Sequence, residues 1–440
     1  MARALLTDLY ELNMAAGYLR RGMVGPATFS LFIRRLPPSR GFLVAAGLED
    51  CLTFLEGFRF ESDELEYARS VLGFGEEAIQ AFAALRFTGD VWAVPEGTIV
   101  FANEPLVEVT APIAEAQVVE TYLLNQITFH TTIASKAARC RIAAEGRDLV
   151  DFSFRRTQGI EAAMGVARTS AMVGFAATSN VEAARRFGLE VAGTMAHSFI
   201  EAFPTEAEAF RAFAEDFPRR TTFLVDTYDT LDGVRTTIET IRSMGLSDHL
   251  GIRLDSGDLG ALAREARSLL DDAGLPMVRI FASGGLDELD IDGLVRGGAP
   301  IDAFGVGTRM GVSSDAPYLD SVYKLVAYGD RPVMKLSPEK ATAPGAKQVF
   351  RAERLRDVIG LRSEPAPPGA RPVLAPVMSG GRRLSPPEPL EAARGRFEAD
   401  LAALPEAARD LRVPDAPTVE FTPALQTLVE RVRAERAPRS

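Results

Sequence analysis

Cysteine and histidine are scarce in this sequence. Its 440 residues include two cysteines, Cys51 and Cys140, and three histidines. The cysteines belong to no closely spaced pair, and no histidine lies in an HExxH pattern. The sequence therefore gives no support to a disulfide framework or a zinc site, and it fits a reducing compartment.

Long apolar runs are also missing. Nothing approaches the ~18 consecutive apolar residues that span a bilayer. The segment from Met1 to Arg20 carries Asp8 and Glu11 inside its apolar stretch, and it lacks the basic-then-apolar order of a signal peptide. We therefore expect a cytoplasmic protein that makes no contact with a membrane.

Acidic residues outnumber basic ones. There are 60 aspartates and glutamates against 49 lysines and arginines, which gives a formal net charge of −11. A negative field keeps a protein soluble and repels polyanions, so no nucleic-acid partner is expected. Hydrophobic residues make up 47% of the chain, enough for two or more domains with cores of their own.

A βα repeat extends over about residues 148–308. Short β-branched or aromatic runs end in small and polar residues, and Ala/Arg/Glu-rich helical stretches follow them. The pattern predicts an α/β fold with a parallel sheet, either an irregular barrel of about seven strands, which we favour, or an open doubly wound sheet. The expected strands are Leu149–Phe154, Met172–Ala176, Leu189–Ala192, Thr222–Asp226, Leu250–Leu254, Val278–Ala282 and Ala303–Val306.

The segments around this repeat have a different character. A helix is expected at Asp8–Arg21, a strand at Thr28–Ile33 and small antiparallel strands within Phe87–Val109. Further strands are expected after the repeat, at Ser321–Tyr328 and Arg331–Leu336, where the chain returns to pair with the N-terminal sheet.

These segments predict three parts of the chain. Residues 1–135 and about 320–362 should form a discontinuous, sandwich-like α+β domain, and residues 136–319 the barrel. Residues 363–440 begin with the Pro-rich run EPAPPGARPVLAP, so we expect a linker and a C-terminal helical extension.

Two glycine-rich turns follow neighbouring strands late in the repeat. Glycine lets backbone N–H groups approach an anion closely, and the N-terminus of the next helix adds a favourable dipole. Late strands of barrels often form such a phosphate site. The alternative is that these glycines only make tight βα turns. The turns contain Ser283, Gly284 and Gly285, and Gly305, Gly307 and Thr308.

Carboxylates follow two of the strands. Alternation along the strand places Arg253 and Asp255 on the same side, with Asp258 in the loop. Carboxylates beside a phosphate site suit ribose hydroxyls or Mg²⁺. The alternative is an Arg–Asp pair within a barrel layer, followed by a helix cap. Asp226 and Asp229 could add oxygen ligands or cap a helix in the same way.

Basic residues lie near the start of the repeat. One of Arg155 and Arg156 must face the converging loops, where a guanidinium could hold a carboxylate; a surface salt bridge is the alternative. Lys136, Arg139 and Arg141 could meet a pyrophosphate from the preceding helix, although a solvated basic helix face is the commoner arrangement.

His197 lies directly after an expected strand, within GTMAHS. A histidine there could act as an acid or base, or as a nucleophile that becomes phosphorylated. A structural histidine is the alternative.

Eight motifs in order resemble those of the nicotinate phosphoribosyltransferase family, and together they cover most of residues 4–351. The resemblance implies a type II phosphoribosyltransferase barrel. It also implies formation of nicotinate mononucleotide and pyrophosphate from nicotinate and phosphoribosyl pyrophosphate in NAD biosynthesis, with ligase-class coupling to ATP hydrolysis and with Mg²⁺. The motifs are LLTDLYELNMAAGYL, DFSFRRTQG, GFAATSN, GTMAHSF, LDSGDL, ASGGLDE, FGVGTRMGVSSDAPYLDSVYKLV and KLSPEKATAPGAKQVFR.

The resemblance also implies a base pocket shared within a homodimer. Tyr10 of a neighbouring subunit would cover the pyridine ring of nicotinate, Phe152 would stack on its other face, and Arg155 would hold the carboxylate. Ser179 would line the pocket. Ser153 and Ala176 stand where the family's usual DFGLRR and GFDGTSN motifs have glycine and aspartate.

The remaining roles concern the sugar and its phosphates. Arg253 and Asp255 would contact the ribose region, the two glycine turns the 5′-phosphate, and Lys136 and Arg139 the rest of phosphoribosyl pyrophosphate. Mg²⁺ would be held by Asp255 and Asp258. His197 matches the histidine that the family phosphorylates with ATP.

Three alternatives stay open. The sister enzyme that uses nicotinamide has the same fold, but a carboxylate near the amide would favour that substrate, and Ala176 and Ser179 supply none. A quinolinate enzyme would need more basic residues for a second carboxylate and would not need His197. A non-catalytic phosphate-binding barrel is disfavoured because His197, Asp255 and Asp258 occur together.

Overall fold

The structure is a computed structural model that describes residues 3–218, 220–337 and 342–436. The chain falls into two units. One contains the residues up to Thr132 and those from Tyr318 onwards, and the other is Ile133–Pro317. Within the described residues, no helix has the length and apolar character needed to cross a membrane.

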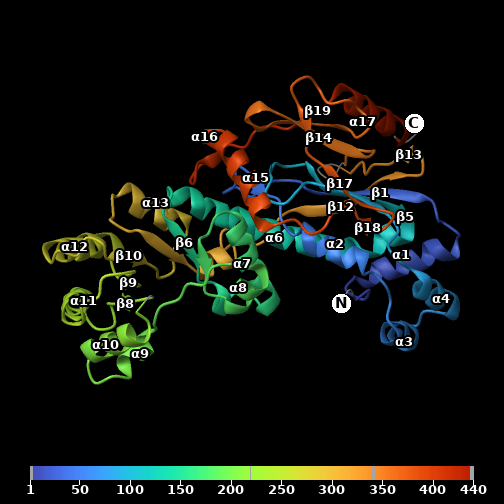
Figure 1. The fold of residues 1–440 in the computed structure, drawn as a ribbon. Coiled ribbons are helices and arrows are strands. Elements are labelled where there is room, and N and C mark those ends of the chain that lie inside the picture. The colour runs from blue at the N-terminus through green and yellow to red at the C-terminus, as the bar shows by residue number, and fades with distance from the viewer. Residues whose placement is uncertain (1–2, 219, 338–341, 437–440) are drawn as a thin grey trace. The chain divides into compact units, whose positions relative to one another are not determined.

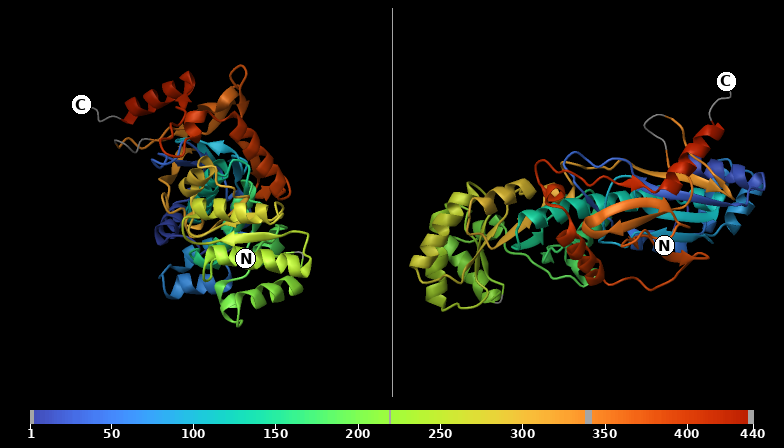
Figure 2. Two further views of the ribbon diagram at one scale, coloured as in Figure 1. Left: turned by 90° about the vertical axis from the view of Figure 1, so that its left-hand side faces the viewer. Right: turned by 90° about the horizontal axis from the view of Figure 1, so that it is seen from above.

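The first unit is built on a seven-stranded sheet with the order β13-β12-β1-β5-β3-β17-β18. Within it, β1 (Pro26–Ile33) pairs antiparallel with β12 (Ser321–Tyr328) and with β5 (Pro105–Pro112). The three strands from the first part of the sequence therefore lie side by side, and strands from its later part flank them on both sides, as the blue, cyan and orange arrows of this unit show (Figures 1 and 2). The strand expected at Ser321–Tyr328 has the predicted bounds, whereas only Arg331–Pro332 (β13) of Arg331–Leu336 is a strand.

Burial explains why β1 is an interior strand of this sheet. Every residue of β1 after Pro26 is buried, and Phe29 stacks on Tyr323 of β12 with ring centroids 4.8 Å apart. Aromatic side chains on neighbouring strands contribute much of the packing energy of a sheet. A second sheet of this unit has four strands, in the order β16 (Arg371–Pro372), β14 (Lys347–Ala352), β15 (Arg356–Leu361) and β19 (Glu420–Phe421).

The segment expected as a linker and peripheral extension is instead part of the first unit. Strand β17 (Ala375–Ser379) pairs with β3 (Asp90–Ala93) in the large sheet. Helix α15 (Leu390–Ala403) inserts Asp400, whose carboxylate lies 2.8 Å from the buried guanidinium of Arg351 on β14. Pairing partners this far apart in the sequence leave no local pattern. The other prolines of the run stand between short strands or at their ends, and Pro376 lies inside β17 where the register shifts, and prolines are tolerated at such places.

The remaining elements of the first unit are short strands and helices around these sheets. They are β2 (Leu43–Val44), β4 (Ile99–Val100), β18 (Arg382–Arg383), α1 (Leu9–Arg20), α2 (Leu48–Glu56), α3 (Ser62–Ser70), α4 (Glu76–Ala84), α5 (Ile113–Val118), α16 (Glu406–Arg409), η2 (Glu353–Leu355) and α17 (Pro423–Arg436), with α6 (Glu120–Ala143) leading into the second unit.

The second unit contains a parallel sheet of six strands. The order is β7 (Ala177–Thr178), β6 (Asp148–Asp151), β11 (Ala303–Val306), β10 (Arg279–Ala282), β9 (Gly251–Leu254) and β8 (Thr222–Leu224). The first and last long strands of the repeat, β6 and β11, pair directly, as they do in a barrel. Val191 adds a single bridge beside β7, and among the described residues no pairing joins it to β8. The sheet is therefore a parallel half-barrel, and the predicted parallel α/β class is correct.

Two of the seven expected strands are not strands, and a third is too long. Met172 ends α7 (Ile160–Met172), and the strand begins only at Ala177, so Met172–Ala176 is wrong. Its apolar residues are buried as a helix end and the turn after it, which periodicity cannot distinguish from a buried strand. Leu189–Ala192 contributes only the bridge at Val191. The first strand ends at Asp151 because Phe154–Arg156 form a 3₁₀ turn, η1.

Aspartate caps fix the helices of this unit to the strand ends. Helices α11 (Thr230–Met244), α12 (Leu259–Asp272) and α13 (Glu288–Arg296) begin after Asp229, Asp258 and Asp287. The side chains of these aspartates accept hydrogen bonds from backbone N–H groups in the first turn of each helix. Helix α11 packs against α12 and α10 (Glu206–Asp216), and Figure 1 shows α10 to α13 in succession along one flank of the strands. The other helices are α8 (Val181–Phe187), α9 (His197–Glu201) and α14 (Thr308–Gly311).

Candidate active site

A hydrogen-bonded cluster lies at the carboxyl ends of β9 and β10. Arg253 on β9 reaches Asp255 two residues on, with its Nη2 2.5 Å from Asp255 Oδ1, as strand alternation predicted. Its Nε donates to Ser283 Oγ at 2.8 Å, and the Ser283 hydroxyl donates to the same Asp255 oxygen. Thr194 Oγ1 accepts from Arg253 Nη1 at 3.2 Å. Such charge-assisted bonds hold the guanidinium and carboxylate in fixed orientations.

Asp255 is a carboxylate held in its ionised form. Burial by itself would raise its pKa, but the hydrogen bond from Ser283 and the charge of Arg253 outweigh that effect, and His197 contributes in the same direction. The net result is a lowered pKa, so Asp255 carries a negative charge at neutral pH. The contribution of His197 also shows that its ring lies within electrostatic reach of Asp255.

His197 is positioned by a short helix and a threonine. It is the first residue of α9, it is half-buried, and its Nδ1 lies 3.1 Å from Thr227 Oγ1. The strand expected directly before it is only the bridge at Val191. A hydrogen bond to one ring nitrogen fixes the orientation of an imidazole. Thr227 and α9 therefore position His197, rather than the end of a strand.

Phe152 lies over the strand ends because β11 has a glycine beneath it. A Cβ atom on Gly305 would come within 2.8 Å of the Phe152 ring. The ring packs beside Phe281 at 5.6 Å between centroids, and the guanidinium carbon of Arg253 lies 5.4 Å from its centroid. Phe152 is thus an aromatic surface next to the Arg253 and Asp255 cluster, with a cation–π contact to hold it.

The glycine turns approach the site with their backbone. Gly284 has φ +106°, and a Cβ there would lie 2.0 Å from the carbonyl oxygen of Asp255. The helix N-termini after these turns contribute less to an anion site than the sequence predicts. Asp287 and Asp290 form a capping box on α13, and Gly307 precedes a helix, α14, of only four residues. Any anion at these turns would therefore be held by the turn backbone itself.

Ser153 and Ser179 lie around a buried carboxylate at the end of β6. Asp151 is fully buried, and it accepts from the backbone N–H of Ser153 at 2.9 Å and from Thr178 Oγ1 at 2.8 Å. Burial raises its pKa. The Ser153 side chain packs against Gly311, where a Cβ would come within 2.4 Å, so the serine is accommodated by a glycine opposite. Ser179 donates its backbone N–H to the Asp151 carbonyl at 2.9 Å and is half-buried.

Lys136 and Arg139 belong to a buried ion-pair network with Glu288, which begins the helix after the first glycine turn. Lys136 is 1% exposed and contacts Glu288 and, at 2.8 Å, Asp315. Arg139 Nε lies 2.9 Å from the other oxygen of Glu288. A buried ammonium with two carboxylate partners is already neutralised. The geometry therefore supports a structural role rather than the predicted pyrophosphate contact.

Asp255 and Asp258, the expected Mg²⁺ ligands, have different roles in the structure. Asp258 accepts from Ala261 N at 3.0 Å as the N-cap of α12, so the alternative interpretation describes its contacts. Asp226 Oδ2 accepts from the backbone of Asp255 at 3.1 Å and from Ser256 Oγ at 2.6 Å. Among the described residues, no group of three or more metal-binding side chains is present.

Two site threonines were missed by the sequence reasoning. Thr194 contacts Arg253 and Thr227 contacts His197. Thr194 lies in the GTMAHS segment, and Thr227 lies between Asp226 and Asp229. The available signal was their place in the sequence near a residue already expected to belong to the site.

Two residues of the expected base pocket lie outside this cluster of contacts. Arg155 lies exposed in η1, after the strand rather than at its end, and Tyr10 lies on α1 in the first unit with 46% of its surface exposed.

Comparison with known proteins identifies the family. The model of the nicotinate phosphoribosyltransferase N-terminal domain matches residues 5–128, and the model of the nicotinate phosphoribosyltransferase family matches residues 148–356. The chain belongs to the nicotinate phosphoribosyltransferase family. The second match contains Arg253, Asp255, Ser283 and His197, so the site described above lies within the part that defines this family.

Relatives within the nicotinate phosphoribosyltransferase family match nearly the whole chain. An enzyme of that name from Mycobacterium tuberculosis is 50% identical over 93% of this chain and 89% of its own. The human enzyme is 32% identical, with 99% of this chain and 98% of its own covered. The crystal structure of human nicotinic acid phosphoribosyltransferase aligns with a TM-score of 0.86 at 30% identity, covering 97% of this chain and 99% of that one. A nicotinate-nucleotide pyrophosphorylase from Pyrococcus furiosus, at 24% identity and a TM-score of 0.76, shares the fold.

Proposed function

We propose that the protein is a nicotinate phosphoribosyltransferase that forms nicotinate mononucleotide and pyrophosphate from nicotinate and phosphoribosyl pyrophosphate, in NAD biosynthesis. The observation that carries this is the cluster of Arg253, Asp255 and Ser283 beside Phe152, within a chain that belongs to this family. An ionised carboxylate, a fixed guanidinium and an aromatic surface adjoin two glycine turns. This set of groups suits a planar base, a ribose and a phosphate.

The residues of the cluster have complementary tasks. Phe152 offers its ring to the pyridine, and the exposed Arg155 is available to pair with the nicotinate carboxylate. Asp255 is ionised, and beside a bound sugar its charge would stabilise the positive charge that develops at the ribose C1 as pyrophosphate leaves. Arg253 fixes Asp255 and provides positive charge near the phosphates.

Mg²⁺ fits this site only with help from the substrate. Asp255 is ionised, and Asp226 has one buried carboxylate oxygen without a hydrogen-bond partner among the described residues. These two carboxylates, rather than Asp258, are the groups that would hold the ion, with phosphate and water oxygens completing its shell. Bound there, Mg²⁺ would neutralise charge on the departing pyrophosphate.

ATP coupling through a phosphorylated His197 is the second part of the proposal. The imidazole is half-buried, oriented by Thr227 and within electrostatic reach of Asp255. A phosphoryl group on this ring would place negative charge beside the sugar site. Incubation with γ-labelled ATP should give acid-labile, base-stable label on the wild-type chain, and equal labelling of His197→Asn would contradict the role.

A homodimer with shared sites is the third part. Leu6, Leu9, Tyr10 and Met14 form an apolar face at and before α1, and Leu9 and Tyr10 are 52% and 46% exposed. An apolar face of this kind marks an interaction surface more often than an isolated hydrophobic residue does. A second copy of the chain would cover it and would bring Tyr10 over the partner's base pocket.

One substrate comparison tests the function. The pure protein is incubated with phosphoribosyl pyrophosphate, Mg²⁺ and ATP, and it is offered nicotinate, nicotinamide or quinolinate in separate reactions. We expect mononucleotide from nicotinate alone. Product from nicotinamide but not from nicotinate would contradict the substrate assignment, and no product from any base would favour a non-catalytic phosphate-binding protein. Asp255→Asn serves as the inactive control.

A further inference from the structure

Two neighbouring turns carry the glycines of the proposed phosphate site. The first, residues 283–287, follows β10, and the second, residues 307–308, follows β11, the parallel neighbour of β10. The first turn donates its leading N–H to Leu254 of β9 at 2.8 Å, and the end of β11 accepts from Phe152, which follows β6, at 2.8 Å. Among the described residues, no backbone hydrogen bond joins the two turns. The backbone therefore leaves the distance between the turns to be set by side chains.

Arg309 joins the second turn to the helix that follows the first. It lies on α14 directly after the second turn, and its Nη1 is 2.7 Å from Asp290 Oδ2 and 3.2 Å from Asp287 Oδ2. Asp287 is the N-cap of α13, and Asp290 completes the capping box of that helix. Both carboxylates are therefore held by backbone N–H groups of α13. A guanidinium that contacts two fixed carboxylates has a fixed position itself.

Lys136 joins the same two segments from the interior of the unit. Its buried ammonium contacts Glu288, the first residue of α13, and lies 2.8 Å from Asp315, which follows α14. The ammonium also acts on the cap of α13. Burial by itself would raise the pKa of Asp287, but hydrogen bonds from backbone N–H groups and the charge of Lys136 lower it. Asp287 is therefore an ionised partner for the guanidinium of Arg309.

We propose that Lys136 and Arg309 are positioning residues that fix the spacing of the two glycine turns and thereby shape the site for the 5′-phosphate of phosphoribosyl pyrophosphate. The inference rests on the proposed function, in which this phosphate is bound by both turns. A phosphate held by backbone N–H groups of two turns needs them at a defined separation, because each hydrogen bond is short and directional. The two cations already contact carboxylates, and they act on the ligand through the turns.

A double-mutant cycle on the bridge tests the proposal with the whole protein. Binding of ribose 5-phosphate is measured by titration calorimetry for wild type, Arg309→Gln, Asp290→Asn and the double variant. Asparagine keeps a side-chain oxygen for the backbone N–H of Asp287, so the cap survives. Each single variant should bind roughly 10-fold more weakly, and the double variant no more weakly than either, because all three break one bridge.

A direct contact between Arg309 and the phosphate gives a different result. Arg309→Gln would then weaken binding, whereas Asp290→Asn would leave it unchanged or tighten it, and that pattern would overturn the positioning role. Additive losses in the double variant would overturn it as well. Arg309→Lys should restore most of the affinity, because an ammonium can still pair with Asp290. An exposed ion pair contributes little to stability, so Arg309→Gln should unfold at the wild-type temperature.

Inorganic pyrophosphate is the second probe, and it tests Lys136. Lys136→Met should weaken the binding of ribose 5-phosphate and leave that of pyrophosphate within a factor of about two. The reverse pattern would mean that Lys136 contacts the pyrophosphate directly, and it would overturn the positioning role. If Lys136→Met does not fold, the Arg309 cycle decides alone. In turnover, Arg309→Gln should raise the KM for phosphoribosyl pyrophosphate roughly 10-fold and leave kcat and the nicotinate KM unchanged, as expected for lost uniform binding.

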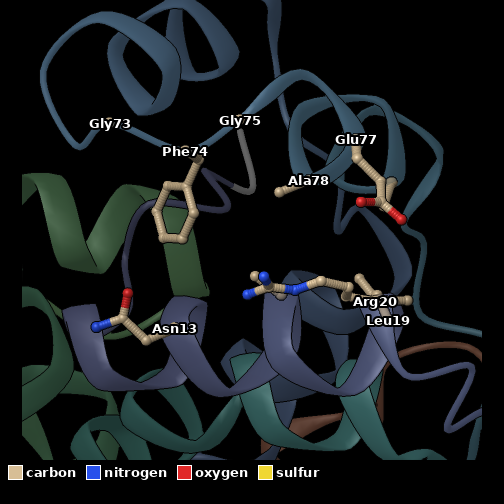
Figure 3. A pocket seen from close by; sticks show the side chains of 10 residues that line it. Asn13, Leu19, Arg20, Gly73, Phe74, Gly75, Glu77 and Ala78 are labelled. Carbon is tan, nitrogen blue, oxygen red and sulfur yellow. The ribbon is translucent and has the colours of Figure 1, made fainter.

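Two arginines serve as controls for the loss of charge. Arg235 pairs with Asp232 on the same helix, α11, so this ion pair joins no separate segments. Arg20 lines a pocket between α1 and the turn at residues 73–75 (Figure 3), and it has no ion pair among the described residues. Arg235→Gln and Arg20→Gln should leave the ribose 5-phosphate affinity unchanged. A loss equal to that of Arg309→Gln in both controls would show that net charge matters instead of the bridge.

The binding measurements need no turnover, so they distinguish failure of this inference from failure of the proposed function. A ribose 5-phosphate affinity that depends on Arg309 and Asp290, in a chain that makes no mononucleotide, would support the positioning role and contradict the proposed function. Mononucleotide formation by a chain whose ribose 5-phosphate affinity is the same in wild type and all variants would overturn the positioning role alone. A wild-type chain that does not bind ribose 5-phosphate would also overturn it.

Discussion

Gly284 lets the turn after β10 press against the end of β9. Its φ of +106° and the 2.0 Å separation between a hypothetical Cβ and the Asp255 carbonyl oxygen both require glycine. Gly284→Ala should therefore shift the turn and Asp255 together, costing about 2–3 kcal/mol of unfolding free energy. It should also raise the KM for phosphoribosyl pyrophosphate.

The neighbouring glycine is a matched control for this prediction. Gly285 has φ +77°, but a Cβ there would meet nothing within 4 Å. Gly285→Ala should cost roughly 1 kcal/mol, through backbone strain alone. Denaturant unfolding and steady-state kinetics of both variants check the difference, and equal effects would show that the contact with Asp255 is unimportant.

Arg155 is exposed in the isolated chain, which suits a group that waits for a charged ligand. A guanidinium that pairs with the nicotinate carboxylate should contribute about 1.5–3 kcal/mol, so Arg155→Ala should raise the nicotinate KM roughly 10- to 100-fold. Arg156→Ala, in the same 3₁₀ turn, should have little effect. If the two effects are reversed, Arg156 holds the carboxylate. A nicotinate KM within a factor of about two of wild type for both variants would place the carboxylate elsewhere.

Helix α15 shows how a single element can be misjudged from sequence. Its residue Asp400 accepts from the backbone N–H of Ile99 at 3.0 Å and pairs with Arg351, which Asp357 also contacts. Asp400→Ala should therefore cost about 3 kcal/mol, because it leaves a buried guanidinium short of a partner. Glu398→Ala on the exposed face of the same helix should stay within about 0.5 kcal/mol of wild type. Equal stability of the two variants would mean that α15 is peripheral.

Some elements could be predicted because their signals are local. Strands β8 to β11 combine a short apolar run with a polar strand-end cluster, and the structure places each of them within one to two residues of its expected start and end. The strand expected at Met172–Ala176 failed because an apolar helix end and a buried strand have the same composition. Strand β17 was missed because its partner β3 lies far from it in the sequence.

The candidate site follows the same division. Arg253 and Asp255 are two residues apart on one strand, so alternation was enough to bring them together. The setting of Lys136 depends on Glu288, which joins it only in the folded unit. A lysine on a helix is identical in sequence whether solvent or a buried carboxylate faces it. Long-range partners of charged side chains are therefore the part of a site that sequence reasoning predicts least well.

At the scale of the whole molecule, each active site of the proposed homodimer contains residues from both chains. A subunit with Tyr10→Ala keeps its own His197, and a subunit with His197→Ala keeps its own Tyr10. In a hybrid dimer, the site that contains the intact His197 receives the partner's intact Tyr10, while the other site has lost both. Random exchange of equal amounts makes about half the dimers hybrid, each with one working site, so about a quarter of the wild-type ATP-coupled activity should return. The measurement is nicotinate-stimulated ATP hydrolysis before and after mixing, with subunit exchange verified by mass-tagged chains. Absence of recovery after verified exchange would mean that each chain supplies its own complete site, and the apolar face that bears Tyr10 would then need another explanation.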